Sequence, residues 1–288
     1  MFLFMAIMQG KKFISPGAWF SLVYPVSWNE FEDAEGTFLF YNPDKWTGNF
    51  RISAYKADPK FPDASVYGKN AARDELKQNP QAVMMQIGSL ECAYSKETFQ
   101  EEGEYYVSHL WITGIENVAF ECSFTVRRGD ADIKQAEDII ASLQLRKDGV
   151  HYPKEIIPIR VLEINEVNEA YEWASSNIKK ILKKDFTASA EDIAKIRQVM
   201  ETGNFKVQQK SPWQSLGIAF GAILVNEIDG MDWVTVVDGN RELAALRFRD
   251  TDVVVYPAQI IWDKVKSGEK CDLQKDFEKI KEEVEKVW

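Results

Sequence analysis

The stretch that most constrains the fold is residues 211–237, SPWQSLGIAFGAILVNEIDGMDWVTVV. Its apolar run from Leu216 to Val225 is ten residues long. A helix needs about 20 apolar residues to cross a bilayer, so the run predicts a helix buried in a protein core. The Asp229-Gly230 pair then marks a turn, and MDWVTVV follows as a strand. We expect this helix and strand to form the centre of a C-terminal domain.

Two glycines in this helix, Gly217 and Gly221, are spaced four residues apart and therefore lie on the same helix face. Such a face allows another backbone to approach closely. The spacing also occurs in membrane helix pairs, but the apolar run is too short for that interpretation. No glycine-rich turn precedes the helix, which argues against a phosphate-binding loop. We expect tight packing of this face against the sheet that follows.

The remaining signals after residue 158 predict an α+β domain made of helices and a small antiparallel sheet. Asp238-Gly239-Asn240 has the residue types of a hairpin turn between two strands. The last helix carries an apolar stripe at spacings of four, three, four and three. Docking of the stripe on its own domain and a homo-oligomer seam are both compatible with the spacing. The expected helices are 165–185, 189–203, 258–266 and 272–288, the expected strands are 231–237, 242–248 and 252–257, and the stripe is Leu273, Phe277, Ile280, Val284 and Val287.

The first half of the chain predicts an antiparallel sheet with flanking helices. Three successive strand candidates form a meander, and the third alternates buried and polar residue types at every position. Before the meander, Asp63 is a helix cap and Asn79-Pro80 closes that helix. After the meander, apolar residues recur at helical spacing in a helix that starts at Asp130 or Asp132. The strand candidates are 90–99, 104–113 and 117–126, the helix candidates are 64–78 and 132–143, and the inward residues of the third strand are Val118, Phe120, Cys122, Phe124 and Val126.

The order of elements up to Leu145 resembles the PsbP-like α/β sandwich. A Tyr24-Pro25-x-x-Trp28 turn after an early strand and a Ser142-Leu143 ending after the last helix carry this resemblance. Proteins of that fold mostly bind other proteins and share no active site, so the resemblance implies binding more than catalysis.

The second half resembles an uncharacterised bacterial family, the partner of the first half in a two-domain arrangement. The residues that carry this resemblance are Trp213, Leu216, Gly217, Gly221, Trp233, Tyr256 and Pro257. No activity is implied by it. The expected organisation is a PsbP-like domain at 1–149, a proline-containing linker at 150–158 and a C-terminal α+β domain at 159–288.

Composition narrows the classes of partner and cofactor. The net charge is −10 and both halves are mildly acidic, which argues against nucleic acid and anionic membranes as partners. The three cysteines form no CxxC pair and the chain has two histidines, so structural zinc patterns and a disulfide framework are excluded. Cys92 and Cys122 fall on the first and third strands of the meander, too far apart for a disulfide, and we expect free thiols.

The N-terminal residues 1–8, MFLFMAIM, are apolar but lack a preceding basic region and a cleavage site. We interpret them as a strand or a start-site artefact rather than a signal peptide. The expected compartment is the cytoplasm.

Residues capable of catalysis do not group in the sequence. His109 lies in a strand and His151 in the linker, with no nucleophile and orienting carboxylate arranged around either. Asp229, Asp232 and Asp238 lie near strand ends, but their spacing matches no calcium loop. We expect no catalytic residue, no cofactor and no metal site. These observations favour a protein that is not an enzyme.

The nine tryptophans are the most suggestive feature for function. Trp46 lies in a predicted loop, where a core residue is not expected. Trp28, Trp46 and Trp111 are therefore candidates for a protein-binding face, since tryptophan is enriched at interface hot spots. Each could equally belong to the sheet core.

The leading hypothesis is a cytoplasmic, non-enzymatic bacterial protein that binds another protein as an adaptor or chaperone does. One alternative is a small-molecule-binding protein or hydrolase with a cleft between the halves. Another is a structural subunit of a homo-oligomer that assembles through the last helix.

Overall fold

The computed structural model describes residues 10–34, 36–60, 62–129, 132–147, 149–239 and 241–288. The apolar segment at residues 1–8 lies outside the described residues. The chain divides into two compact units, residues 1–151 and residues 152–288. Each unit has its own hydrophobic core.

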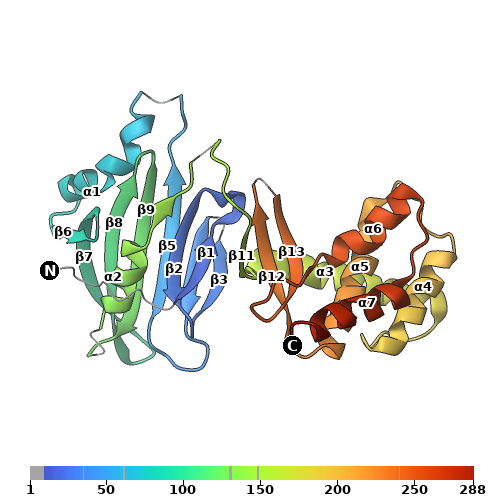
Figure 1. Ribbon diagram of the computed structural model, residues 1–288. Coiled ribbons are helices and arrows are strands. Elements are labelled where there is room, and N and C mark those ends of the chain that lie inside the picture. The colour runs from blue at the N-terminus through green and yellow to red at the C-terminus, as the bar shows by residue number, and fades with distance from the viewer. Residues whose placement is uncertain (1–9, 35, 61, 130–131, 148, 240) are drawn as a thin grey trace. The chain divides into compact units, whose positions relative to one another are not determined.

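The N-terminal unit contains two antiparallel sheets (Figure 1). The larger sheet has seven strands in the order β3-β4-β5-β9-β8-β7-β6, and the smaller has three in the order β1-β2-β10. The predicted meander is confirmed, since β7, β8 and β9 pair in succession. The bounds are β1 Gly10–Ile14, β2 Phe20–Pro25, β3 Asn29–Ala34, β4 Thr37–Tyr41, β5 Asn49–Lys56, β6 Val83–Ile87, β7 Leu90–Glu101, β8 Glu104–Ile115, β9 Val118–Arg127 and β10 Gln144–Leu145.

The core of this unit lies between the two sheets and is rich in aromatic rings. Phe20 of the small sheet makes an edge contact with Phe120 of the large one, with ring centroids 5.3 Å apart. The helix α2 (Lys134–Ala141) adds Ile139 and Ile140 to the same core. The predicted alternation in β9 is confirmed, because its five inward residues are all buried. We call this buried side of the seven-stranded sheet its inner face.

The opposite, outer face is covered at one end by helix α1 (Tyr67–Gln78). Two glycines allow this close approach. A Cβ atom on Gly68 would lie 2.0 Å from the Val118 carbonyl oxygen, and one on Gly114 would lie 2.3 Å from the Gly68 carbonyl oxygen. The glycines therefore fix α1 against β8 and β9.

The C-terminal unit combines a four-stranded antiparallel sheet, in the order β11-β12-β13-β14, with five α-helices among its described residues. The expected linker at 150–158 is wrong in part, since Glu155–Pro158 forms β11 and pairs with β12. Asn240 of the predicted hairpin turn lies outside the described residues. The bounds are β11 Glu155–Pro158, α3 Val161–Leu182, α4 Ile193–Glu201, α5 Lys210–Glu227, β12 Met231–Asp238, β13 Arg241–Phe248, β14 Val254–Val255, α6 Pro257–Ser267 and α7 Leu273–Glu285.

Helix α5 is the centre of this unit, as its unbroken apolar run predicts. Its residues from Leu216 to Gly221 are all buried. The prediction that the glycine face meets the sheet needs correction. A Cβ atom on Gly217 would lie 2.2 Å from the Pro257 carbonyl oxygen, so the close neighbour is the start of α6. From the sheet, the Trp233 ring would lie 2.9 Å from a Cβ atom on Gly221.

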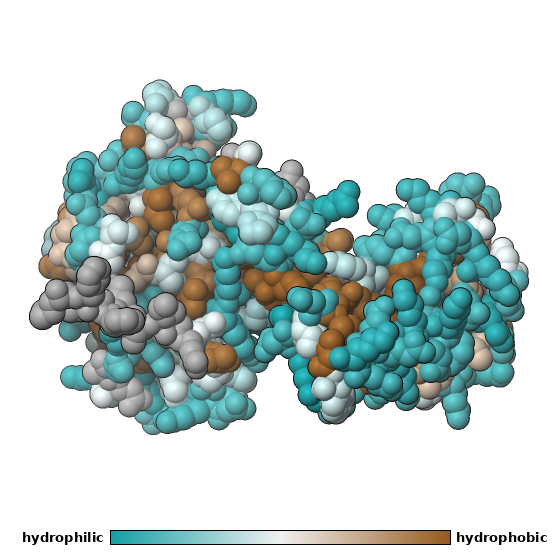
Figure 2. All heavy atoms as spheres, in the orientation of Figure 1, coloured by the Kyte–Doolittle hydropathy of each residue, from teal (hydrophilic) through white to brown (hydrophobic). Residues whose placement is uncertain are grey.

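The apolar stripe of α7 packs within its own unit. Leu273, Phe277, Ile280 and Val284 all belong to the C-terminal core, while Val287, beyond the helix, is exposed. Figure 2 shows mostly hydrophilic residues on the visible side of α4 and α7. The stripe is therefore not available as an oligomer seam, and the alternative that rested on it loses its basis.

No helix in the described part of the chain is both long enough and apolar enough to span a membrane.

Candidate functional site

The three tryptophans singled out from the sequence lie in two different environments. Trp28 and Trp111 are 1% and 0% exposed, so the expectation of an exposed face is wrong for both. Trp111 faces inward from β8, and Trp28, between β2 and β3, stacks on the inward Phe124 with ring centroids 6.2 Å apart. Trp46 is 45% exposed and lies between β4 and β5. It remains the one candidate of the three that a partner can reach.

Trp46 is the first member of a row of three aromatic side chains. Its ring lies edge-on to Tyr106, with centroids 6.5 Å apart, and Tyr106 stacks on Phe99 at 5.6 Å. Phe99 and Tyr106 are direct cross-strand partners on β7 and β8. Phe99 is 37% exposed and Tyr106 is partly buried. We call Trp46, Tyr106 and Phe99 the aromatic row.

Sequence reasoning missed Tyr106 and Phe99. A usable signal was present in β7, because Phe99 shares its side of the strand with Glu97 and Glu101. An aromatic residue on an otherwise polar strand face indicates an apolar side chain that lies on the surface and not in the core.

The outer face continues from the row as a shallow polar surface. The next cross-strand pairs are Glu97 with Ser108 and Ser95 with Leu110. The Ser108 and Thr125 hydroxyl groups share a hydrogen bond of 3.2 Å, which orders the middle of the surface. A pocket of about 190 Å³ lies here, closed at one side by residues after α1, and its lining is Asn79, Gln81, Ser95, Lys96, Glu97, Ser108 and Leu110. The row and this pocket form one continuous candidate site.

The β7–β8 hairpin beside the row is strongly acidic. Glu101 and Glu104 are direct cross-strand partners. Glu102 and Gly103 form the turn between them, and both have a left-handed backbone conformation. All three carboxylates are exposed. Like charges this close repel one another, so the hairpin tip favours a basic neighbour. The tip gives the aromatic row a negative border.

His109 is held in a small aromatic cluster on the inner face. Its Nδ1 shares a hydrogen bond of 2.7 Å with the Tyr94 hydroxyl, and its ring stacks on Trp111 with centroids 6.0 Å apart. Burial, with the nearby Lys96 charge, lowers the pKa of His109. Burial, with the Glu137 charge, raises the pKa of Tyr94. The pair is therefore a neutral phenol and a neutral imidazole at pH 7, which suits a structural hydrogen bond.

The three cysteines are free, and for Cys92 and Cys122 the strand spacing predicts this. Burial raises the pKa of Cys92 and of Cys122, and the Cys92 thiol donates to the Leu90 carbonyl oxygen at 3.8 Å. Neither thiol is therefore an ionised nucleophile at neutral pH.

The other polar candidates are separate from this site. His151 is exposed, and Asp229, Asp232 and Asp238 are exposed on the C-terminal unit. Among the described residues, no group of three or more His, Cys, Asp or Glu side chains is placed to hold a metal ion.

Comparison with family models identifies both halves of the chain. A domain of unknown function, DUF3805, matches residues 8–168, which is more than half of the chain. The chain belongs to the DUF3805 family. A second domain of unknown function, DUF3806, matches residues 192–277. The predicted two-domain recognition is confirmed, and the candidate site lies in the DUF3805 half.

A crystal structure from Bacteroides thetaiotaomicron VPI-5482 is similar to this DUF3805 chain over nearly its whole length. The two are 54% identical, and the match covers 94% of this chain and 98% of the other with a TM-score of 0.88. No match was found among curated proteins.

Two more distant structures match about half of the chain. Cyanobacterial PsbP from Synechocystis sp. PCC 6803 is 10% identical, covers 49% of this chain and 96% of its own, and has a TM-score of 0.26. LpqN of Mycobacterium tuberculosis, described as involved in cell envelope biogenesis, is 14% identical, covers 49% of this chain and 88% of its own, and has a TM-score of 0.25. Neither of these distant matches brings an activity to this chain.

Proposed function

We propose that this protein is a non-enzymatic cytoplasmic adaptor whose N-terminal unit binds another protein on the outer face of its seven-stranded sheet. The observation that carries the proposal is the aromatic row. Trp46 and Phe99 remain 45% and 37% exposed although they are joined through Tyr106 into one ordered group. Ordered, exposed aromatic side chains bind at low entropic cost, which is why such residues dominate protein interfaces.

The carboxylates at the hairpin end of the row indicate the chemistry of a partner segment that binds there. Glu101, Glu102 and Glu104 form a negative border, and the whole chain carries a net charge of −10. Lysine and arginine side chains pair with carboxylates and also stack over aromatic rings. We therefore propose a partner segment that presents basic residues next to apolar ones.

The environment of the titratable groups supports binding rather than catalysis. The thiols of Cys92 and Cys122 are un-ionised, and His109 is engaged with Tyr94 on the inner face, away from the aromatic row. The three free cysteines also suit a reducing compartment, which supports the cytoplasmic placement.

The test is affinity capture from a lysate of the source organism, followed by titration calorimetry with the captured partner. The wild-type chain should retain one stoichiometric partner. Trp46→Ala should weaken its binding by roughly 30-fold, as expected for an interface hot spot of about 2 kcal/mol. Reversal of the hairpin charges, Glu101→Lys with Glu104→Lys, should weaken binding most at low salt, where charge attraction is least screened.

Tyr67→Ala is the matched control, because Tyr67 is 44% exposed on α1, outside the row. It should bind as the wild type does. A stoichiometric partner that binds the Trp46→Ala chain with unchanged affinity would contradict the proposed site. Failure to retain any stoichiometric partner would contradict the proposed function itself.

A further inference from the structure

A second candidate interaction surface is the free edge of strand β6. This strand is the last one at its end of the seven-stranded sheet, next to β7 (Figure 1). Its sequence, VMMQI, contains no charged residue. Val83 is 58% exposed and Met84 is 43% exposed. The edge is therefore open, largely apolar and uncharged.

The hairpin between β6 and β7 decides which backbone groups of β6 point to the free edge. Ile87 and Leu90 are partners across a two-residue turn, and such a pair exchanges both of its backbone hydrogen bonds. Hydrogen-bonded and non-hydrogen-bonded pairs alternate along antiparallel strands, so every second residue back from Ile87 also bonds to β7. The N–H and C=O groups of Met84 and Gln86 therefore point outward, away from β7.

A contact on β7 supports this alternation. Glu91 is the cross-strand partner of Gln86, and its carbonyl oxygen accepts from the Thr113 hydroxyl of β8 at 2.8 Å. The Glu91 carbonyl thus points away from β6, as expected at a non-hydrogen-bonded pair. In the described part of the chain, no strand pairs with the outward side of β6. Its outward backbone groups are therefore a template for one more strand.

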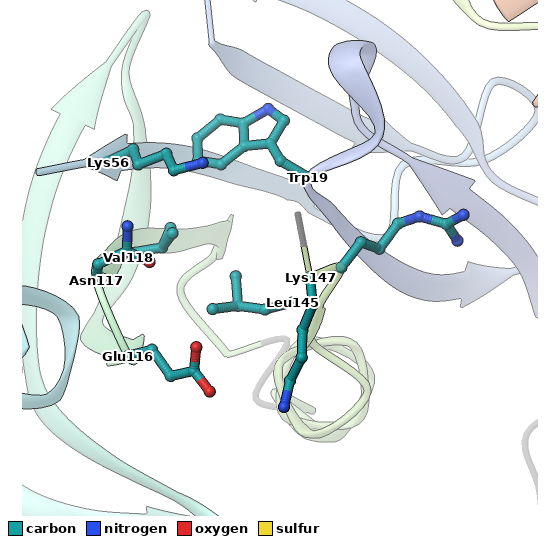
Figure 3. Close-up of a pocket in the computed structure, with 8 residues that line it drawn as sticks. Trp19, Lys56, Glu116, Asn117, Val118, Leu145 and Lys147 are labelled. Carbon is teal, nitrogen blue, oxygen red and sulfur yellow. The ribbon is translucent and has the colours of Figure 1, made fainter. Parts of the chain in front are cut away.

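The other sheet edges in the described ranges carry features that discourage strand pairing. The sequence of β3, NEFEDA, contains three acidic residues, and its pairing with β4 has a register shift. Strand β1 contains two lysines, and β11 contains Pro158, which has no N–H to donate. Strands β10 and β14 are two residues long, and Figure 3 shows Leu145 of β10 pointing into a pocket beside Trp19. Among these edges, β6 combines length, regular pairing and absence of charge.

We propose that β6 pairs in antiparallel register with β6 of a second copy of this chain, so that the two seven-stranded sheets join edge to edge. A two-fold axis perpendicular to the sheets relates the two copies. With Met84 opposite Gln86 of the partner subunit, every outward N–H meets an outward C=O. The same register places Met85 opposite Met85 of the partner subunit.

Charge favours a second copy as the occupant of this edge. The chain carries a net charge of −10, so two copies repel one another over most of their surfaces. Self-pairing through β6 places no like charges across the seam, because the strand has none. A basic segment would find no carboxylate on β6. The contact involves few residues, so the dimer should be weak and reversible.

Sedimentation velocity of the full chain over a concentration series measures this association. A reversible monomer–dimer equilibrium is expected, with a Kd on the order of 10 µM for so small an interface. ¹H–¹⁵N NMR spectra of the same series locate the contact. The amide signals of Met84 and Gln86 should shift with concentration, while those of α7 should not.

Met84→Pro tests the backbone contact. It removes an outward N–H that β7 does not use, so the variant should fold and should dimerise at least about tenfold more weakly than wild type. Met84→Val keeps the N–H and an apolar side chain, and should dimerise as the wild type does. Dispersed NMR spectra establish that each variant is folded.

A cysteine variant gives a second test that does not depend on proline. The proposed register makes Met85 and its copy a non-hydrogen-bonded pair with Cα atoms about 4.5 Å apart, which is within reach of a disulfide. Met85→Cys should therefore form a cross-linked dimer under mild oxidation. Val207→Cys is the control, because Val207 is 49% exposed on the C-terminal unit, and it should form much less.

Three results would overturn the proposal. One is a full chain that remains monomeric at about ten times the expected Kd, even if the edge took a strand from another protein. Another is a folded Met84→Pro chain that dimerises as the wild type does. The third is equal cross-linking of Met85→Cys and Val207→Cys.

Discussion

At the scale of single residues, the least expected feature is a buried ion cluster in the C-terminal unit. Arg160 is 2% exposed and Glu163 is 3% exposed. The Arg160 Nε donates to Glu163 at 2.9 Å, and its Nη2 donates to Glu242 at 2.6 Å. The Thr235 hydroxyl donates to the same Glu163 carboxylate at 3.1 Å. The cluster joins the start of α3 to β12 and β13.

Glu163→Gln should destabilise the protein by about 3 kcal/mol, because removing one partner leaves the buried Arg160 charge undercompensated. Urea unfolding of the purified variant measures this change. Glu166→Gln removes an exposed carboxylate one turn further along α3 and should change stability by less than about 0.5 kcal/mol. Equal effects of the two variants would show that the cluster does not hold α3 on the sheet.

Asp192 is a second buried charge and makes stability depend on pH. It is 0% exposed, and it accepts from the Thr187 N–H at 2.5 Å and from the Thr187 hydroxyl at 3.1 Å. Burial by itself raises the pKa of Asp192, but the ion pair with Lys195 and the two Thr187 hydrogen bonds outweigh it and hold that pKa below its usual value.

A depressed pKa gives Asp192 a stabilising contribution that is fully present above the unfolded-state pKa of about 3.9 and is lost as the pH falls through the lower folded-state value. Asp192→Asn should therefore cost about 2 kcal/mol at pH 7, and the difference from wild type should shrink below about pH 4. Thermal unfolding between pH 7 and pH 3 checks this. Glu191→Gln, at an exposed neighbouring carboxylate, should show no comparable pH-dependent difference. A stability difference between Asp192→Asn and wild type that stays the same from pH 7 to pH 3 would contradict a depressed pKa for Asp192.

At the scale of elements, the close crossing of α5 and α6 is the most demanding contact. Gly217→Leu would push a side chain into the Pro257 backbone, so we expect a loss of about 3 kcal/mol or more in the stability of the C-terminal unit. Ala222→Leu adds a larger side chain on the same helix, where a pocket of about 280 Å³ gives it room. That control should change stability by less than about 1 kcal/mol, as measured by thermal unfolding. An unchanged melting temperature for Gly217→Leu would mean that α5 does not meet α6 in this way.

The elements were predictable from the sequence where a hydrophobic period repeats. Residues 117–126 alternate at every position, and the α7 stripe recurs at helical spacing, so both assignments are confirmed. Strand β11 was missed because it is four residues long and contains Pro158, which hides any period. The contact between the α5 glycines and α6 was missed. The four-residue spacing of the glycines predicts that another backbone approaches this helix face, but it does not identify the element to which that backbone belongs.

The candidate site was predictable in part for a similar reason. Trp46 stood out because proline and glycine near it indicated a loop. Trp111 was misplaced because a tryptophan in a strand has the same local sequence whether it faces the core or solvent, and Trp28, between β2 and β3, because its turn does not show which way the ring points. Tyr106 and Phe99 meet Trp46 through strand pairing, a contact between segments far apart in the chain that no local period records.

At the scale of the whole molecule, the chain consists of two units with separate cores, matching two domains of unknown function. The proposed protein-binding site belongs to the N-terminal unit, where the aromatic row and the acidic β7–β8 hairpin lie side by side.

The central claim is that a partner protein binds on the outer face of the seven-stranded sheet. Hydrogen–deuterium exchange of the full chain, alone and with the captured partner, tests this most directly. We expect slower exchange in residues 42–48 and 95–108, which carry the aromatic row and its neighbouring surface, and unchanged exchange in α7. Slower exchange confined to the C-terminal unit, with residues 42–48 and 95–108 unaffected, would contradict it.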